Sequence, residues 1–377
     1  MSLPPFTWLG PTRVVFGAGV LERLSAVVEE VASARAPIFL VTGRKSLEAS
    51  GVLARVLDAL GPRPVTRFAD VPPFPSPEVA EDARAACRAA GAGVVVAIGG
   101  GSVLDVAKCA AVLAVHDGPL RDFAERRREV ERPGLPLVAV PTTSGSSSEV
   151  TPFAALWDMT ARRSLHLAHP RLFRAVALVD PVLTLGMPRH LAAATGADAF
   201  TSAFESYWSR EASPLTDTLD LEVIRQFASH LERSCADADP TARAACALAA
   251  TMSGLAYSNS RPNVCHAVSS PLTLFWGVAH GQAVAVTLPA FLRWNAPAIA
   301  EKLPALWWAL GVDGLDGAAA RLTALLAGCG LETRLGGLGV QAGDVETLVE
   351  HMRWDRTTVL PRPLGRDDAR AIFRELL

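Results

Sequence analysis

Three polar residues in the second half of the chain have side chains that could together bind a metal ion. Asp198 lies in the string TGADAF, His266 in NVCHAV and His280 in VAHGQA. One carboxylate and two neutral imidazoles suit Zn²⁺ or Fe²⁺, and three protein ligands leave a coordination position open for a substrate oxygen. Spacing alone would favour three unrelated polar residues over a metal site. The other histidines stand in charged or turn-like contexts and are expected at the surface: His116, His166, His169, His190, His230 and His351.

A glycine-rich string in the first half is typical of phosphate binding. Residues 94–108 read VVVAIGGGSVLDVAK, an apolar strand that runs through glycines into a helix. Glycine lets the backbone approach a phosphate closely, and the free N–H groups at the start of a helix favour negative charge. A plain strand–turn–helix connection is the alternative, but the strand context favours a dinucleotide site. The residues expected at the ribose and phosphates are Gly99, Gly100, Gly101, Ser102, Asp105 and Lys108.

A second loop, residues 141–149, reads PTTSGSSSE and follows the apolar run 137–140. Its hydroxyl groups would offer small donors to a ligand. A solvated Ser/Thr loop that caps the next helix explains the same residues equally well.

The elements that must position these residues follow two patterns. Before about Pro181, short apolar runs alternate with helical patterns, which predicts a parallel sheet covered on both faces with ligands at the carboxyl ends of its strands. The expected strands are Val14–Phe16, Ile38–Thr42, Val94–Ile98, Leu137–Val140 and Ala175–Val179. Later patterns have helical spacing over Leu191–Trp208, Leu215–Leu231, Ala242–Ser258, Ala298–Leu310 and Val345–Met352.

We therefore expect an α/β dinucleotide-binding domain, Rossmann-like, over residues 1–182 and an all-α domain over residues 183–377. The stretches Arg121–Pro136 and Arg356–Arg366 are rich in proline and arginine and are expected to be surface loops.

Composition excludes several kinds of partner. The 377 residues carry 36 Lys and Arg against 38 Asp and Glu, so no basic excess favours nucleic acid or a membrane surface. The first residues do not resemble a signal peptide, and no run of about twenty apolar residues would span a membrane. The six cysteines are scattered and are expected to be reduced core thiols. These features together predict a cytoplasmic protein.

Five strings carry a resemblance to a known family: GGGSVLDVAK, PTTSGSSSEVT, LVDPVLT at 178–184, TGADAFTSAFESYWS from 195 and CHAVSSPLTLFWGVAHGQAVAV from 265. In this order, the chain resembles the iron-containing (group III) alcohol dehydrogenases along nearly its whole length. The resemblance implies hydride transfer between a nicotinamide dinucleotide and a small aldehyde or alcohol, and possible homodimers. It places Asp198, His266 and His280 at metal-ligand positions for Fe²⁺ or Zn²⁺, and Thr142, Thr143 and Ser147 beside the cofactor.

Two serines depart from the family pattern. Ser202 stands four residues after Asp198, where members with four protein ligands carry a histidine. Ser270 stands four residues after His266, where many members carry a histidine assigned to proton transfer. Four residues is one helical turn, so each serine shares its partner's face. A three-ligand site similar to that of glycerol dehydrogenases stays compatible with the sequence, with lower metal affinity. A metal-free relative is the alternative, and Ser270 is the candidate for proton transfer.

The resemblance also suggests a cofactor and a substrate. Gly43 and Arg44 follow the second apolar run, where a small residue beside a cation would accept a 2′-phosphate, so we expect NADPH in preference to NADH. The strings EVTPFAALWD and FESYWS are similar to phosphonoacetaldehyde reductases, which make 2-hydroxyethylphosphonate in phosphonate biosynthesis. Arg163, Arg261 and Ser202 are the residues expected to hold an anionic phosphonate.

Other activities stay open at this point. A dehydrogenase for a neutral alcohol or aldehyde fits the same motifs. A lyase similar to dehydroquinate synthases is disfavoured, because the Thr-rich loop continues as SSSEVT and no lysine-bearing GGK segment follows it. A relative that binds a nucleotide without catalysis is the third alternative.

Overall fold

Six parallel strands form the sheet of the first part of the chain. In this computed structural model, which describes residues 5–377, the strand order is β1-β8-β5-β4-β2-β3 and every pairing is parallel. The strands are β1 (Arg13–Phe16), β2 (Ile38–Gly43), β3 (Val65–Val71), β4 (Val94–Gly99), β5 (Leu137–Pro141) and β8 (Val176–Val179). All five expected strands are confirmed. The edge strand β3 was missed because Arg67 and Asp70 interrupt its apolar residues.

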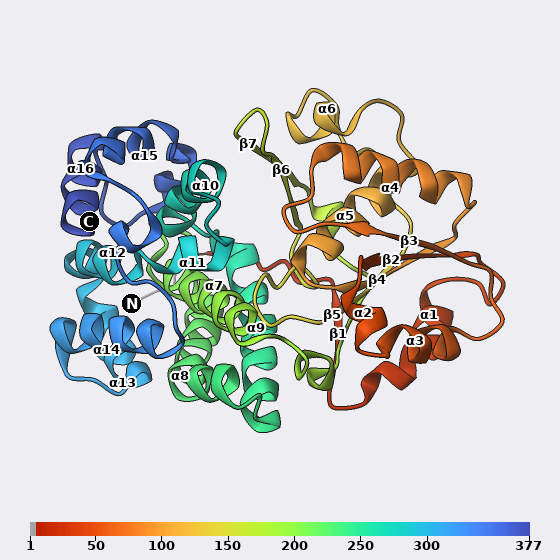
Figure 1. The fold of residues 1–377 in the computed structure, drawn as a ribbon, viewed down its shortest axis with the longest axis horizontal. Helices are drawn as coiled ribbons and strands as arrows, with labels where there is room; N and C mark the ends of the chain where they lie inside the picture. The colour runs from red at the N-terminus through yellow and green to blue at the C-terminus, as the bar shows by residue number, and fades with distance from the viewer. Residues whose placement is uncertain (1–4) are drawn as a thin grey trace. The chain divides into compact units, whose positions relative to one another are not determined.

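Helices cover both faces of this sheet, as Figure 1 shows. Ile38 and Leu40 of β2 belong to a core that also contains residues of α1 (Leu24–Val31) and α3 (Val52–Leu60). Phe39 and Val41 belong to a second core with residues of α4 (Pro77–Ala89) and α5 (Gly101–Leu113). Successive residues of a strand point to opposite faces, so a run that is apolar throughout is buried on both.

An antiparallel hairpin, β6 (Phe153–Asp158) and β7 (Arg163–Ala168), was not predicted. Its apolar side chains share a core with residues of α5 and of α6 (Leu120–Ala124). The expected surface loop Arg121–Pro136 is therefore partly wrong, because it begins in α6 and buries Phe123 and Val130. His116 was expected at the surface but is buried: Nδ1 contacts the Val112 carbonyl at 2.9 Å. The shorter helices here are η1 (Val20–Arg23), α2 (Ser46–Ala49), η2 (Pro170–Leu172) and η3 (Pro181–Thr184).

Residues 187–377 contain helices joined by loops and no strand. The longer ones are α7 (Arg189–Trp208), α8 (Pro214–Ala236), α9 (Pro240–Ser260), α10 (Val264–Trp276), α11 (His280–Ala285), α12 (Leu288–Asn295), α13 (Leu303–Leu310), α14 (Gly314–Gly328), α15 (Val345–His351) and α16 (Arg366–Glu375). The short 3-10 helices are η4 (Ala296–Lys302), η5 (Gly336–Leu338), η6 (Ala342–Asp344) and η7 (Trp354–Val359). The expected all-α second part is confirmed. The expected loop Arg356–Arg366 is partly wrong, because it begins inside η7 and its residue Leu360 is buried.

The chain divides into an α/β unit, residues 10–186, and a helical unit that contains residues 187–377. The sequence placed this boundary four residues earlier. Residues 5–9 group with the helical unit, since the Leu9 N–H donates to Asn259 Oδ1 at 2.7 Å and Asn259 Nδ2 donates to the Leu9 carbonyl at 3.0 Å.

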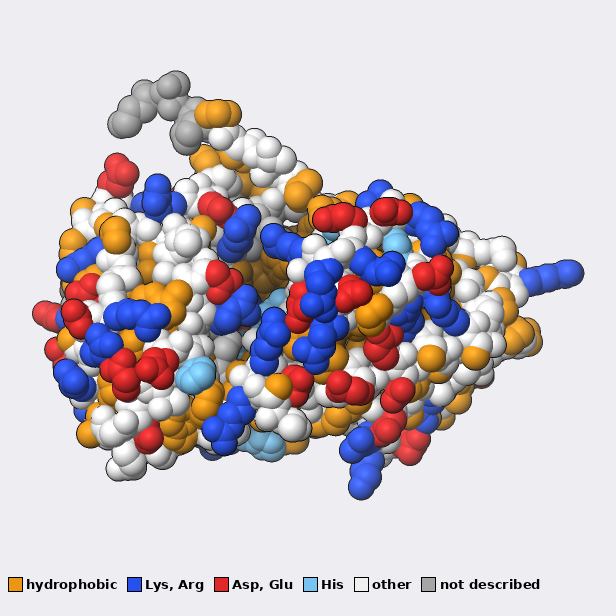
Figure 2. All heavy atoms as spheres, turned by 90° about the horizontal axis from the view of Figure 1, so that it is seen from above, with side chains coloured by type: hydrophobic (Ala, Val, Ile, Leu, Met, Phe, Trp, Pro, Cys, Tyr) orange, Lys and Arg blue, Asp and Glu red, His pale blue; other side chains and the backbone are white. Residues whose placement is uncertain are grey.

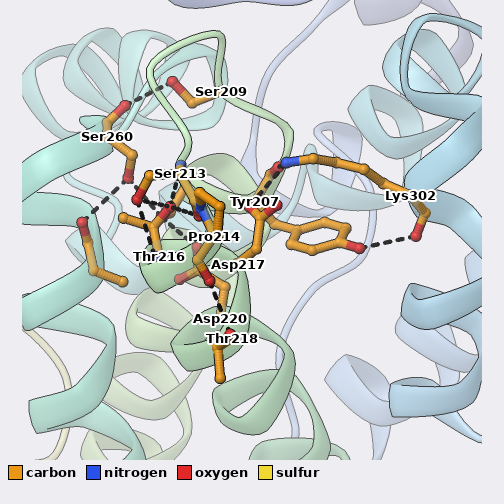
Figure 3. Close-up of polar contacts among 12 residues, drawn as sticks. Tyr207, Ser209, Ser213, Pro214, Thr216, Asp217, Thr218, Asp220, Ser260 and Lys302 are labelled. Atoms are coloured by element: carbon orange, nitrogen blue, oxygen red, sulfur yellow. Dashed lines mark hydrogen bonds and ion pairs between the residues drawn. The ribbon is translucent and has the colours of Figure 1, made fainter. Parts of the chain in front are cut away.

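Helix α7 lies in the core of the helical unit. Phe200, Phe204 and Trp208, spaced one turn apart, are all buried. Its C-terminal end is held by the contacts drawn in Figure 3: the Tyr207 hydroxyl donates to the Lys302 carbonyl at 2.8 Å, and Lys302 Nζ donates to the Tyr207 carbonyl at 2.8 Å. A helix buried along its length and fixed at its end is a rigid support for functional side chains.

Acidic and basic side chains are interspersed on the face shown in Figure 2. This distribution agrees with the formal net charge of −2. Within the described residues, no helix combines the length and apolar character needed to cross a bilayer.

Candidate functional site

Three helices of the helical unit bring Asp198, His266 and His280 together. Asp198 lies on α7, His266 on α10 and His280 at the first position of α11. One ligand atom from each residue lies within 4.8 Å of the other two. Gly281 permits this approach, because a Cβ atom there would be 1.8 Å from the carbonyl oxygen of Ala194 on α7. The structure thus assembles the three predicted ligands, and their donor atoms fit a small divalent metal.

The charges within this triad support metal binding. His266 Nε2 lies 3.3 Å from Asp198 Oδ1, and the two imidazole centroids are 5.5 Å apart. Burial alone would lower the pKa of His266, but the carboxylates of Glu205 and Asp198 outweigh it and raise this pKa to about 9. Burial lowers the pKa of His280 to about 4. Burial would raise the pKa of Asp198, yet the two histidines hold it below its ordinary value. Two carboxylates around these imidazoles thus form a site that attracts a cation.

Glu205 orients His266. This fully buried carboxylate accepts hydrogen bonds from the backbone N–H of Cys265 at 2.5 Å and of His266 at 3.3 Å, and it pairs with His266 Nδ1. With Nδ1 protonated and paired to Glu205, Nε2 is the nitrogen that faces Asp198 and that a metal would bind after displacing its proton. The sequence analysis missed Glu205, although it stands seven residues after Asp198 and therefore two turns along the same helix face.

Asn263 joins the start of α10 to the end of α7. Its Oδ1 accepts from Trp208 Nε1 at 2.8 Å and from the N–H of Val264 at 3.0 Å, while Nδ2 donates to the Glu205 carbonyl at 2.8 Å. The position of His266 relative to Glu205 is thereby fixed from both helices. An asparagine just before an apolar helical pattern is a signal for a helix start that was available in the sequence.

Pro271 brings a further segment to this site. Proline lacks an N–H, so a proline inside a helix leaves the carbonyl four residues earlier without its helical partner. That carbonyl belongs to Ala267, next to His266, and it accepts the N–H of Arg353 at 3.1 Å. Helix η7, which starts one residue later and contains Arg356, is therefore attached to α10 beside the triad.

Ser202 and Ser270 lie one turn beyond Asp198 and His266 on α7 and α10, and both are buried. A serine is much smaller than the imidazole that the family pattern has at each position. The two positions therefore supply one small hydroxyl group each instead of an imidazole.

The glycine-rich segment of the α/β unit lies at the topological switch point of the sheet. The chain places β3 on one side of β2 and β4 on the other, and Thr42 of β2 is in register with Ile98 of β4. Gly43 and Gly99 therefore end neighbouring strands, and the N–H of Thr142 after β5 donates to the Gly99 carbonyl at 3.0 Å. Open α/β sheets bind their ligands at the carboxyl ends of strands at such a point.

The hydroxyl-rich loop after β5 packs against these glycines. A Cβ atom at Gly100 would lie 3.2 Å from Thr143 Cγ2, and one at Gly101 would lie 2.5 Å from Ser146 Oγ. Helix α5 begins at Gly101, and Ser102 is part-buried in its first turn. Two expected ligand loops therefore form one surface at the N-terminus of α5, where N–H groups favour an anion.

Asp105 holds the second loop in place. Its carboxylate accepts from Ser148 Oγ at 2.5 Å and from the N–H of Ala155 at 2.9 Å. Ser147 is buried, with a positive φ of 49°, and its hydroxyl donates to the Gly145 carbonyl at 3.0 Å. The structure thus gives Asp105 and Ser147 roles in the shape of the loop, and their contacts with a cofactor stay predictions.

Lys108 is fully buried and its amine already has partners. Nζ donates to the Phe153 carbonyl at 2.5 Å and to Thr151 Oγ1 at 3.2 Å, and it lies 3.6 Å from an oxygen of Asp105. Burial lowers its pKa to about 7. The predicted contact of this amine with a cofactor phosphate would require those bonds to break, so we assign Lys108 to the support of the loop.

Arg44 follows Gly43 at the end of β2 and is exposed. Its Nε lies 2.6 Å from Asp70 Oδ1, in an ion pair whose side chains are 56% and 74% exposed. An exposed pair of this kind contributes little free energy. Arg44 can therefore exchange Asp70 for a ligand phosphate at small cost.

The two arginines expected to hold an anionic substrate are exposed and already paired. Arg163 lies 3.2 Å from Glu125, and Arg261, just after α9, lies 3.2 Å from Glu211 with 67% of its side chain exposed. Both side chains thus lie at the surface, and each is paired with a glutamate.

Comparison with known proteins agrees with this geometry. The family described as "Iron-containing alcohol dehydrogenase" matches residues 11–181, and "Fe-containing alcohol dehydrogenase family, C-terminal" matches residues 192–377. The chain is 34% identical to long-chain-alcohol dehydrogenase 1 of Geobacillus thermodenitrificans, over 96% of this chain and 95% of that protein. It is 40% identical to a phosphonoacetaldehyde reductase of Streptomyces viridochromogenes, over 67% of this chain and 64% of that protein.

A crystal structure of sulfoacetaldehyde reductase from Bifidobacterium kashiwanohense in complex with NAD⁺ has a similar fold. It superposes with a TM-score of 0.93 at 27% sequence identity, over 99% of both chains. Together with the family matches, this likeness favours a dehydrogenase or reductase over the lyase and non-catalytic alternatives. The chain belongs to the iron-containing alcohol dehydrogenase family and is an NAD(P)-dependent oxidoreductase of alcohols or aldehydes.

Proposed function

We propose that this protein reduces phosphonoacetaldehyde to 2-hydroxyethylphosphonate with NADPH. The observation that carries the proposal is the triad of Asp198, His266 and His280, flanked by Ser202 and Ser270 in place of two imidazoles. A relative that is 40% identical is a phosphonoacetaldehyde reductase, and a structural neighbour is a sulfoacetaldehyde reductase. Both names describe two-carbon aldehydes with a tetrahedral anionic group, which supports a substrate of this class.

Asp198, His266 and His280 would hold the metal. A divalent ion with an open coordination position supplies Lewis-acid polarisation of a carbonyl oxygen. The chain's own contribution is to prepare each ligand: Glu205 would hold the proton on His266 Nδ1, so that a metal displaces only the proton on Nε2, and burial keeps His280 neutral. Neutral imidazoles and an ionised carboxylate are the forms that bind metals.

The α/β unit would hold the cofactor, whose nicotinamide supplies the hydride. Gly99, Gly100 and Gly101 let the backbone approach the pyrophosphate, and the N-terminus of α5 supplies N–H groups. Thr142 and Thr143 are part-buried on the adjoining loop and would donate to the cofactor. Ser102 and Ser147 belong to the same two loops.

NADPH is the proposed cofactor because Arg44 follows the small residue Gly43 at the end of β2. The guanidinium would bind the 2′-phosphate in place of Asp70. Arg44→Ala should lower kcat/KM for NADPH about tenfold or more and change that for NADH little. Equal losses of kcat/KM for both cofactors would show that Arg44 does not recognise the 2′-phosphate.

Ser270 and Ser202 would provide hydroxyl groups at the substrate. Ser270, one turn after His266, would pass a proton to the product oxygen, while Ser202 would donate to the phosphonate. Ser270→Ala should therefore lower kcat more than it raises KM, and Ser202→Ala should mainly raise the KM for an anionic aldehyde. The opposite pattern would exchange these two roles.

NADPH oxidation by anaerobically metal-loaded protein tests the substrate directly. The comparison uses phosphonoacetaldehyde, sulfoacetaldehyde and propionaldehyde, a neutral aldehyde of similar size. A kcat/KM highest for phosphonoacetaldehyde would support the proposal, and one highest for sulfoacetaldehyde would change the anion but keep the class. Turnover of propionaldehyde alone would favour a neutral substrate, as in the relative from Geobacillus thermodenitrificans.

A further inference from the structure

Arg356 lies in a segment that is fixed at both ends within the helical unit. At its start, the Arg353 N–H donates to the Ala267 carbonyl, which Pro271 has left without a helical partner. At its end, the Val359 carbonyl accepts the N–H of Arg210 at 2.8 Å. Helix η7 between these points packs against α10. Arg356 therefore occupies a defined place next to the helix of His266.

Arg356 lies three residues after Arg353, whose N–H binds the Ala267 carbonyl next to His266, in a helix that packs against α10. The charge of Arg356 lowers the pKa of His280, and the Glu205 carboxylate acts on Arg356 in turn. The side chain is only partly exposed, and burial lowers the pKa of its guanidinium. Arginine side chains keep their charge in proteins.

Arg356 has no counter-ion of its own in the part of the chain that the structure describes. Arg353 forms two hydrogen bonds with Asp355, at 2.9 and 2.8 Å, which occupy both oxygens of that carboxylate. Glu205 already receives two backbone N–H groups and the imidazole of His266. Among residues 5–377, no ion pair or side-chain hydrogen bond reaches the Arg356 guanidinium. A partly buried cation without a partner is costly unless a ligand supplies the negative charge.

The charges around the triad favour such a ligand. Asp198 and Glu205 carry one negative charge each, which a divalent ion in the triad would balance. Arg353 and Asp355 cancel each other. With Arg356 added, the triad and its charged neighbours have one net positive charge. This charge attracts an anion and disfavours a cationic substrate.

We infer that Arg356 binds the tetrahedral oxyanion, phosphonate or sulfonate, of the aldehyde substrate and thereby determines specificity. This inference rests on the proposed function. It assigns the role that the sequence suggested for Arg163 and Arg261 to a less exposed arginine beside the triad. A guanidinium donates two parallel N–H groups, a geometry that matches two oxygens of such a group.

The test compares Arg356→Gln and Arg356→Lys with Arg362→Gln, a matched control. Arg362 is exposed and stacks on Trp294 at 3.6 Å from the ring centroid. The first readout is calorimetric binding of methylphosphonate and of methanesulfonate, which have the anionic group but no aldehyde. The second is the KM for phosphonoacetaldehyde, sulfoacetaldehyde and propionaldehyde in metal-loaded protein.

Arg356→Gln should weaken binding of the favoured anion by about 30-fold and raise the KM for the corresponding aldehyde by a similar factor. The KM for propionaldehyde should change by less than about threefold, since no charge is recognised. Arg356→Lys keeps the positive charge but lacks the two parallel N–H groups of the guanidinium, so its loss of anion binding should lie between that of Arg356→Gln and the unchanged protein. If the glutamine variant does not fold, as judged from its unfolding temperature, the lysine variant carries the test. Arg362→Gln should behave like the unchanged protein.

Two outcomes separate this inference from the proposed function. If the unchanged protein prefers an anionic aldehyde and the Arg356 variants keep that preference, the inference is overturned while the function stands. If the unchanged protein shows no preference but Arg356→Gln loses methylphosphonate binding, the anion site stands and the proposed substrate is wrong. Unchanged methylphosphonate and methanesulfonate binding in both Arg356 variants overturns the inference in either case.

Discussion

Replacing Glu205 by glutamine changes one atom of a buried side chain, and the structure predicts a large loss of metal affinity. The carboxylate has acceptors only, and it meets three donors: two backbone N–H groups and the protonated Nδ1 of His266. A glutamine side chain has one acceptor oxygen and an NH₂ group that only donates. It cannot satisfy all three donors.

Each orientation of the amide has a cost. If the amide oxygen faces the N–H groups of Cys265 and His266, the NH₂ group faces Nδ1, which must then lose its proton. The proton moves to Nε2, and that nitrogen can no longer bind a metal. If the oxygen faces Nδ1, two backbone N–H groups stay buried without a partner, at about 1–3 kcal/mol each. We expect the first arrangement and a 10- to 100-fold loss of metal affinity, about 1.4–2.8 kcal/mol.

The assay is competition between the protein and a chelating dye for Zn²⁺, together with the unfolding temperature of the metal-free protein. Glu222→Gln is the control, because Glu222 is a half-exposed carboxylate on α8 that pairs with Arg225. The expected result is weaker Zn²⁺ binding in Glu205→Gln alone. Unchanged Zn²⁺ affinity in that variant would refute the reasoning, even if the metal-free protein unfolded at a lower temperature.

Two further variants test other parts of the helical unit. Gly281→Ala places a Cβ atom 1.8 Å from the backbone of α7, so α11 must shift; we expect a loss of about 1–3 kcal/mol in unfolding free energy and weaker Zn²⁺ binding. Gly343→Ala, where no atom lies within 4 Å, is its control, and equal effects would contradict the packing argument. Burial raises the pKa of Asp220 well above its ordinary 3.8, and in Figure 3 this carboxyl lies in the network around Ser260. The folded state therefore keeps a proton that the unfolded state loses, and stability falls as pH rises from about 4 towards the raised pKa. In urea unfolding, Asp220→Asn should gain about 1.4 kcal/mol relative to the unchanged protein per pH unit in this window, and a gain independent of pH would contradict this sign.

The elements that sequence patterns predicted well are those whose burial is uniform. β2 is apolar from Ile38 to Val41 and β4 from Val94 to Ile98 because both faces of the sheet are covered, and amphipathic helical patterns follow from one buried stripe. β3 lies at the edge, and the hairpin β6–β7 packs only one of its faces, so their patterns are mixed. Tertiary contacts determine the secondary structure of such segments, and these contacts cannot be inferred from the pattern of a single sequence.

The candidate site shows the same division. Metal ligands could be predicted because their residue types are chemically specific, and the resemblance fixed their positions. Glu205 and Arg356 were missed because an acidic residue in a helix and an arginine in a proline-rich stretch are ordinary surface residues in most sequences. Their roles depend on Asn263 and Pro271, which determine what α10 contacts at its start and in its middle. That information lies in pairs of residues far apart in the chain.

The departures from the family pattern form a consistent set when charge and space are considered together. With Ser202 in place of a fourth ligand, a metal in the triad receives fewer donors and keeps more of its positive charge. With Ser270 in place of an imidazole, the site gains room and a neutral hydroxyl beside His266. Arg356 adds a cation to which no ion pair or side-chain hydrogen bond is made within residues 5–377. Under the proposed function, the two serines and Arg356 together would favour an anionic substrate over a neutral one. The Arg356 variants and the comparison of aldehydes test this proposal from independent directions.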